Sequence, residues 1–253
     1  MLLFVEAVGF RGRGTELTSA YPGAHMTRTT NARIAGITFL FYIAIGITSM
    51  VLMNRATSAE GTAAIIARVA GHAADVRIAI VLELLQCVSA FVLAVTLYAI
   101  TRDEDHELAM LGLTCRVAEG VIGAIGIPKE LGLLWLATAA PGALAPDPAA
   151  ANALGEFLLM PDPNPPIGAI FFAVGSMIFS YLLLRGRMVP VGLAWLGVFA
   201  SALLVVGLPL QLAGFFTGAL AGYQWLPALV FELVLALWLL IKGVAAPARR
   251  QSE

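Results

Sequence analysis

The chain has 253 residues, of which 60% are hydrophobic and 12% are charged, and its formal net charge is −1. A soluble domain usually carries about 25% charged residues, and a chain without excess positive charge has no basic field that would attract nucleic acid. The composition therefore excludes a soluble globular protein and a nucleic-acid-binding protein. It predicts an integral membrane protein whose surroundings are the lipid bilayer.

The first 25 residues differ in composition from the rest of the chain. MLLFVEAV is too short for the core of a signal peptide and lacks a basic start. The segment MTRTTNARIAGITFL, which begins at Met26, is typical of a natural start directly before a span. Residues 1–30 are therefore predicted to be a disordered cytoplasmic extension, unless Met26 is the true initiator, which the composition favours.

Six segments are long and apolar enough to cross a membrane. A crossing helix needs about 20 mostly apolar residues, and lipid offers no partner to an unpaired backbone amide. The sequence therefore predicts an all-α bundle of six transmembrane helices within residues 31–243, followed by a cytoplasmic tail at 244–253. The predicted spans are 34–54, 78–101, 108–127, 167–184, 191–212 and 224–241.

A shorter helix is predicted between the first two spans, in SAEGTAAIIARVAGHAADVR at 58–77. Its apolar residues Ile65, Ile66, Val69 and Val76 recur about every three to four positions, which is the period of a helix. The segment is too short and too charged to span. We therefore expect a short interfacial helix that lies along the membrane surface.

Pro128 interrupts the third span. A single straight helix from Leu108 to Ala139 would be about 48 Å long, well over the hydrocarbon thickness of about 30 Å. We therefore predict that Pro128 kinks or ends the helix, and that the residues after it tilt, lie at the interface or dip back into the membrane. The Pro-rich stretch PGALAPDP…MPDPNPP is predicted to be the longest loop, so the path of residues 128–163 stays open.

Lys and Arg residues beside the predicted spans are unevenly distributed. The terminal flanks and the loops after the second and fourth spans hold most of them, whereas the opposite side holds only Arg55, Arg68 and Arg77. Positively charged flanks stay in the cytoplasm. Both termini are therefore predicted to be cytoplasmic.

Four ionisable side chains lie well inside apolar runs: Glu83, Arg116, Glu119 and Glu232. A charge at membrane depth is costly and is tolerated where it faces a protein interior, a water cavity or a partner charge. At a rise of 1.5 Å per residue, these four lie about 8, 18, 13 and 12 Å below the outer edge. The sequence thus predicts one buried polar cluster, with Gln86 at i+3 from Glu83 on the same helix face.

Three carboxylates and one guanidinium do not balance, so the cluster requires a bound proton or a cation, unless Lys129 reaches in. Three functions are compatible with it. Our working hypothesis is a site that binds or moves a small solute or a proton. The second is a structural or partner-binding subunit in which the charges form an interhelical ion-pair knot, and the third is an intramembrane enzyme that acts on lipid. Lys129 and Glu130 are expected at the interface, and Tyr42 in an interhelical hydrogen bond.

No motif for catalysis or metal binding accompanies these charges. The sequence contains no GxSxG, HExxH or GxxxxGK[ST] pattern. Its three His residues fall outside the predicted spans, which argues against a bis-histidine haem. We therefore predict neither a metal nor another cofactor, the enzyme hypothesis rests on the carboxylates alone, and the oligomeric state stays open.

Three segments resemble a known family of bacterial membrane proteins, domain-of-unknown-function family 4386. NARIAGITFL at the first span, CRVAEGVIGAI in the third and FELVLALWLLIKG in the last are similar, in this order, to its opening, Arg-x-x-Glu-bearing and closing helices. The resemblance runs from about Asn31 to Gly243. It implies a multi-pass protein of the bacterial plasma (inner) membrane, and it implies no activity.

Overall fold

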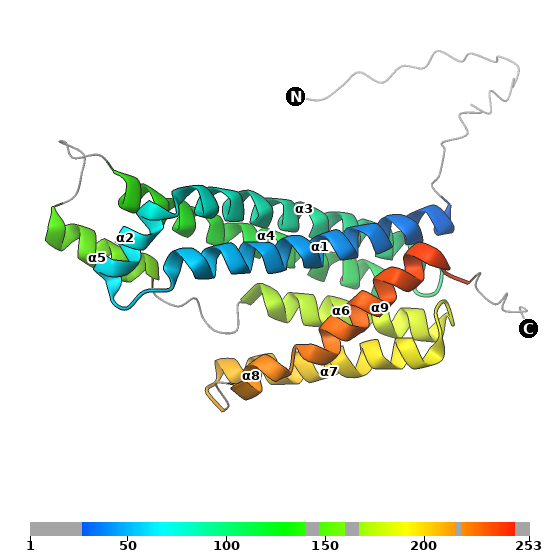
Figure 1. Cartoon of the computed structure of the whole chain (residues 1–253). Coiled ribbons are helices and arrows are strands. Elements are labelled where there is room, and N and C mark those ends of the chain that lie inside the picture. The colour runs from blue at the N-terminus through cyan, green and yellow to red at the C-terminus, as the bar shows by residue number, and fades with distance from the viewer. Residues whose placement is uncertain (1–26, 140–146, 160–166, 216–218, 246–253) are drawn as a thin grey trace, which may run out of the picture.

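The computed structural model describes residues 27–139, 147–159, 167–215 and 219–245, and all regular structure in these ranges is helical (Figure 1). Six helices are long and apolar enough to cross a membrane, and a short apolar helix stands between the first two. The predicted all-α, six-span fold is therefore confirmed. The expectations for residues 1–26, for an initiator at Met26 and for most of the tail lie outside the described residues.

The helices follow one another through the chain with short connections. Their bounds are α1 Arg28–Thr57, α2 Thr62–Gly71, α3 Ala73–Thr101, α4 His106–Thr138, α5 Pro148–Leu159, α6 Ile167–Arg185, α7 Val191–Leu212, α8 Ala219–Tyr223 and α9 Leu226–Ile241. The six long apolar helices pack as a ring in chain order, from α1 through α3, α4, α6 and α7 to α9, which returns to α1. Both ends of the described chain therefore lie at one end of the bundle, here called the terminal side, and the opposite end is called the loop side (Figure 1).

The spanning helices fall into a long set and a short set. α1, α3 and α4 have 30, 29 and 33 residues, or about 44 to 50 Å at the rise of an α-helix. α6, α7 and α9 have 19, 22 and 16 residues, or about 24 to 33 Å, which is close to a hydrocarbon thickness. The long helices therefore project beyond the short ones on the loop side, where α2 and α5 cover them (Figure 1).

α4 passes through Pro128 and continues to Thr138, so the predicted end of the third span near Ile127 is wrong. Proline removes one helical hydrogen bond, and packing after it offsets that cost. Leu133 and Leu134 are buried against Val69 of α2 and against Val76 and Ile80 of α3. The extra length is thus held by an apolar cluster on the loop side.

α5 was not predicted, because the Pro-rich composition indicated a loop. The helix nevertheless has a local start signal. The N–H of Ala150 donates to Oδ1 of Asp147 at 2.9 Å, and Pro148 occupies the first helical position. An Asp cap followed by Pro is typical of a helix start. Within the predicted path of 128–163, α4 therefore runs to Thr138 and α5 covers Pro148–Leu159, and the ranges 140–146 and 160–163 lie outside the described residues.

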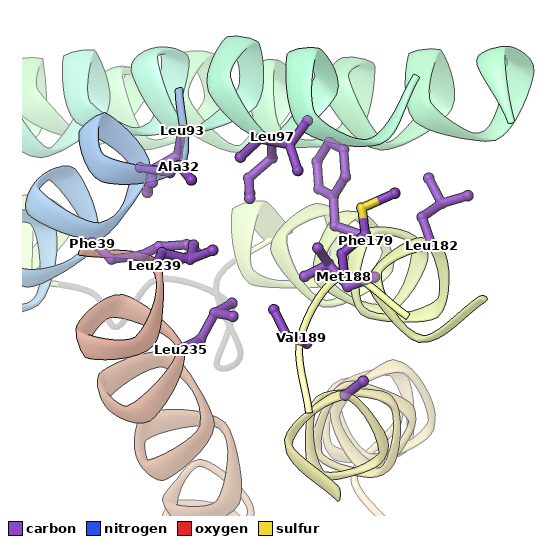
Figure 2. Packing of buried hydrophobic residues seen from close by; sticks show 14 of the residues in the cluster. Ala32, Phe39, Leu93, Leu97, Phe179, Leu182, Met188, Val189, Leu235 and Leu239 are labelled. Atoms are coloured by element: carbon purple, nitrogen blue, oxygen red, sulfur yellow. The ribbon is translucent and has the colours of Figure 1, made fainter. Parts of the chain in front are cut away.

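The terminal half of the bundle is tightly packed with apolar side chains, here called the terminal-side core (Figure 2). It draws on α1, α3, α6 and α9 and on the turn after α6. Its members include Phe39, Leu93, Leu97, Phe179, Leu182, Met188, Leu235 and Leu239. This core closes the bundle between the polar residues described below and the terminal side.

The start of α4 is fixed by a capping and ion-pair arrangement outside the spans. The N–H of Leu108 donates to Oδ1 of Asp105 at 3.1 Å. At the end of α6, Nη1 of Arg185 lies 2.9 Å from Oδ2 of Asp105, and Nε of Arg185 lies 3.1 Å from Oε1 of Glu104. The backbone hydrogen bond from Leu108, reinforced by Arg185, lowers the pKa of the Asp105 carboxyl below its usual value. These contacts tie α4 to α6 at the terminal side.

Candidate functional site

The centre of the candidate site is an ion pair within α4. Nη1 of Arg116 lies 2.9 Å from Oε2 of Glu119, and the two side chains are one turn apart at i and i+3. Arg116 is 1% exposed and Glu119 8% exposed. Gly175 of α6 makes room for the arginine, because a Cβ there would lie 3.2 Å from Cγ of Arg116. The sequence prediction that these two charges share a face is met in the structure.

Aromatic side chains from two other helices complete the surroundings of the pair. The hydroxyl of Tyr42 in α1 donates to Oε1 of Glu119 at 2.7 Å, which is the interhelical hydrogen bond expected of that tyrosine. The Arg116 guanidinium carbon lies 5.0 Å from the ring centre of Phe172 and 5.7 Å from that of Tyr42. Both distances suit cation–π attraction, so α1 and α6 hold the cation through their rings.

Glu232 of α9 is the third charge of the site, and it lacks a direct partner in the described part of the chain. It is 7% exposed, yet among the described residues none forms a hydrogen bond or an ion pair with it within 4 Å. Nε and Nη2 of Arg116 are likewise buried without a described partner. A cavity of about 10 Å³ is bordered by Arg116, Glu232, Ser176 and Ser180. That volume is enough for about one water molecule, which could bridge the guanidinium and Glu232.

We use the name polar site for Arg116, Glu119, Tyr42 and Glu232. The polar site lies at the inner end of a groove of about 570 Å³. Glu119, Tyr42 and Glu232 border the groove, together with Gln86 and Cys87 of α3. Its walls are formed by α1, α3, α4 and α6 and by the stretch from Trp225 into α9. Since α6 and α9 begin at the loop side, and their lining residues lie in the first turns, the groove occupies the loop half of the bundle.

The groove exists because α1 and α9 touch at one end and separate toward the other (Figure 1). They meet near the terminal side at Gly36, where a Cβ would lie 2.7 Å from the backbone oxygen of Ala236. Only a residue without a side chain allows backbones to approach so closely. From this crossing the helices diverge toward the loop side, and the groove fills the space between them.

The structure separates Glu83 from the other predicted members of the cluster. Glu83 accepts a hydrogen bond from the hydroxyl of Ser49 at 2.9 Å and is half-buried, and it does not border the groove. Gln86 does border it, beside Gly46 of α1. Lys129 and Glu130 lie in the part of α4 beyond Pro128, about three turns from Glu119 along the helix.

Two aromatic members of the site were not identified from the sequence. Phe172 and Trp225 border the groove and stack on one another, with ring centres 6.0 Å apart. A Trp at the start of a span is usually an interfacial belt residue, and Phe172 has no polar atom to distinguish it. The signal that could have identified Phe172 is its spacing to Ser176 on one face of α6. Among the described residues, no group of three His, Cys, Asp or Glu side chains could hold a metal ion.

The comparisons with known proteins give one match. The model of a family described as Domain of unknown function (DUF4386) matches residues 34–243, which include all of the polar site. No curated protein matches the chain, and no solved structure does. The family resemblance inferred from the sequence is therefore confirmed.

Proposed function

The chain belongs to the family described as Domain of unknown function (DUF4386), and since that description assigns no activity, we propose a function from the site itself. The protein binds a small solute or a proton at the polar site, within the membrane. Its six apolar helices make it a multi-pass membrane protein. Binding takes place at the inner end of the groove, where Glu119 and Glu232 meet it.

The observation that carries this proposal is the position of Glu232. A carboxylate buried in an apolar span is costly unless a partner compensates it. Glu232 is more than nine-tenths buried, borders the groove on one side and the water-sized cavity on the other, and has no directly bonded partner among the described residues. A ligand cation or a proton would supply the missing compensation.

The ion-pair knot is the rival function, and the geometry gives it less support. A knot that fixes helix register joins charges on different helices, whereas Arg116 and Glu119 lie on the same helix. The direct polar link from this pair to another helix is the hydrogen bond of Tyr42. The pair therefore contacts α1 and α6 through Tyr42 and Phe172 rather than through a charge on another helix, and it leaves the charge of Glu232 unexplained.

We further propose that the protein lies in the bacterial inner membrane with both termini in the cytoplasm. The support is the excess of Arg and Lys at the terminal side and the general preference of positive flanks for the cytoplasm. In that orientation the groove is on the external half of the membrane. Solute would then reach the polar site from outside.

Two measurements test the proposed function together. Native mass spectrometry of the protein purified in mild detergent identifies small molecules that it retains, and thermal unfolding from about pH 5 to about pH 9 reports a linked proton. We expect a retained solute, or a pH-dependent stability that Glu232→Gln removes while the variant still folds. An empty protein whose stability is flat over this range, with Glu232→Gln behaving like the wild type, would contradict the proposal.

A further inference from the structure

The groove has the size of a site for an organic molecule rather than for a bare ion. Its volume is about 570 Å³, within the range of about 300 to 1,000 Å³ that is typical of small-molecule sites. Most of its lining is apolar, from Ile43, Ile47, Met50, Ala169 and Leu229. Polar groups gather at the inner end, so an occupant needs a polar end and an apolar body.

With Glu232 ionised, the charge at that inner end is negative. Arg116 is already paired with Glu119 at 2.9 Å, and Glu232 lies beyond ion-pair distance of the guanidinium. One positive and two negative side chains leave one uncompensated carboxylate at the groove. A cationic group on the occupant would pair with it, whereas an anionic group would be repelled.

Aromatic rings border the same space. Tyr42, Phe172 and Trp225 all line the groove, and two of them already hold the Arg116 guanidinium over their faces. Aromatic faces attract cations, and quaternary ammonium groups are commonly recognised in this way. The rings and the carboxylate therefore both favour a positively charged ligand.

The divergence of α1 and α9 gives such a ligand a route from the bilayer (Figure 1). Ile47 and Met50 of α1 and Leu229 of α9 line the groove and are 49%, 57% and 37% exposed. These side chains lie within spans, so the exposed edge of the groove faces lipid. An amphiphile dissolved in the bilayer could enter between the two helices.

We propose that the groove binds a monovalent organic cation with an apolar body, which enters between α1 and α9 and pairs with Glu232. This inference rests on the proposed function. The cationic centre lies beside Glu232 and the aromatic rings. The apolar body lies along α1 and α9 toward the loop side. Gln86, which has no hydrogen bond to another described residue, offers its amide oxygen to an N–H of the ligand.

The two cysteines provide a direct test without any substitution. Cys87 lines the groove, whereas Cys115 is buried and does not. The wild-type protein in nanodiscs is alkylated with N-ethylmaleimide, and peptide mass spectrometry follows each thiol. The ligand probes are benzyltrimethylammonium and neopentylbenzene, which differ by a nitrogen cation in place of a carbon, and the larger pair tetraphenylphosphonium and tetraphenylborate, which have opposite charges.

We expect at least one cation to slow the alkylation of Cys87 saturably, with no such effect of its neutral or anionic counterpart and no change at Cys115. Glu232→Gln should weaken this protection at least about tenfold. Glu83→Gln removes a carboxylate at a similar predicted depth that accepts from Ser49 outside the groove. It serves as the matched control and should leave the protection, relative to the variant's own rate without ligand, unchanged.

Equal protection of Cys87 by the neutral or anionic probe, or no protection by either cation, would overturn the cation assignment. The wild-type protein alone decides this point, so the test holds even if Glu232→Gln does not fold. The proposed function is judged separately. If the cations fail but pH-dependent stability that requires Glu232 is observed, the polar site binds a proton and the ligand class is wrong. If both fail and native mass spectrometry also finds no retained solute, the proposed function is wrong as well.

Discussion

Arg116 is enclosed by contacts that differ in kind. Glu119 supplies an ion pair at 2.9 Å, and the rings of Phe172 and Tyr42 cover the guanidinium. Two of its nitrogens are buried without a described partner, and the residue borders the water-sized cavity. Arginine remains charged at any pH that the protein meets. The stability of this arrangement therefore depends on how well the charge of Arg116 is compensated, because the side chain does not lose its proton.

Arg116→Met should strongly destabilise the protein, because it leaves the carboxylate of Glu119 buried without its cation. Breaking a buried pair on one side typically costs about 3–5 kcal/mol. The double variant Arg116→Met/Glu119→Gln removes both charges and should recover most of the loss. Unfolding in mixed detergent micelles measures the two free energies. A double variant as unstable as the single one would show that the unpaired Glu119 is not the cause.

The depth of each charged residue in the membrane could be predicted from the sequence, but the direction in which its side chain points around the helix axis could not. Counting 1.5 Å per residue placed four charges in one layer, and Arg116 and Glu119 do meet because a spacing of i and i+3 fixes their direction as well. Glu83 has a similar depth but accepts from Ser49 away from the groove. The rotation of α3 about its axis depends on its packing against α1 and α4. The sequence does not reveal this rotation, because a membrane helix is apolar on its lipid-facing and its protein-facing sides alike.

The α1–α9 pair shows how one element contact shapes the site. Gly36 lets the backbones touch near the terminal side, and the spreading of the helices beyond it forms the groove. The spans themselves were predictable from hydropathy, whereas the continuation of α4 past Pro128 depended on long-range packing against α2 and α3. Local signals can indicate a helix break, but they cannot weigh it against contacts made elsewhere.

Gly36→Ala should lower stability by about 1–3 kcal/mol, because a Cβ would lie 2.7 Å from a backbone oxygen of α9 and force the helices apart. Gly126→Ala in α4 is the matched control, since a Cβ there meets nothing within 4 Å. The same change at Gly126 should be neutral or stabilising by up to about 1 kcal/mol. Equal losses in thermal unfolding would contradict the role of the close approach.

Asp105 links α4 to α6, and its contribution should depend on pH. Its folded-state pKa is lowered by the Leu108 N–H and by Arg185, so the contribution is present above the unfolded pKa of about 3.9 and is lost as the pH falls through the folded value. Asp105→Ala should therefore lower the melting temperature near neutral pH, with a smaller difference from the wild type near about pH 3.

Asp103→Ala is the control for this change, because Asp103 is exposed and lies 3.9 Å from Arg102 without capping α4. It should melt like the wild type at both pH values. If Asp105→Ala keeps the same deficit at low pH, the ionised carboxylate does not account for its effect.

The whole molecule is divided into two halves of different character. The terminal half is closed by the terminal-side core (Figure 2), whereas the loop half holds the groove and is extended by α2 and α5. The polar site lies where the halves meet. In the conformation described here the groove therefore lies in the loop half and is closed toward the terminal side.

The proposed orientation predicts opposite labelling of two exposed positions. Ser58→Cys, after α1 on the loop side, should react with a membrane-impermeant maleimide in intact spheroplasts. Asp103→Cys, between α3 and α4 on the terminal side, should react only after permeabilisation. Peptide mass spectrometry separates these thiols from Cys87 and Cys115. The reverse pattern would place the groove in the cytoplasmic half of the membrane.

The closure of the helix ring by α9 has a consequence for synthesis. A ribosome makes the chain from the N-terminus, so α4 enters the membrane well before α9 exists. Arg116 does not have to wait for that helix, because Glu119 is one turn away on the same helix and α1, which supplies Tyr42, is already in place. Glu232 and the α9 wall arrive last. The groove is therefore absent from every nascent chain until the final span has inserted.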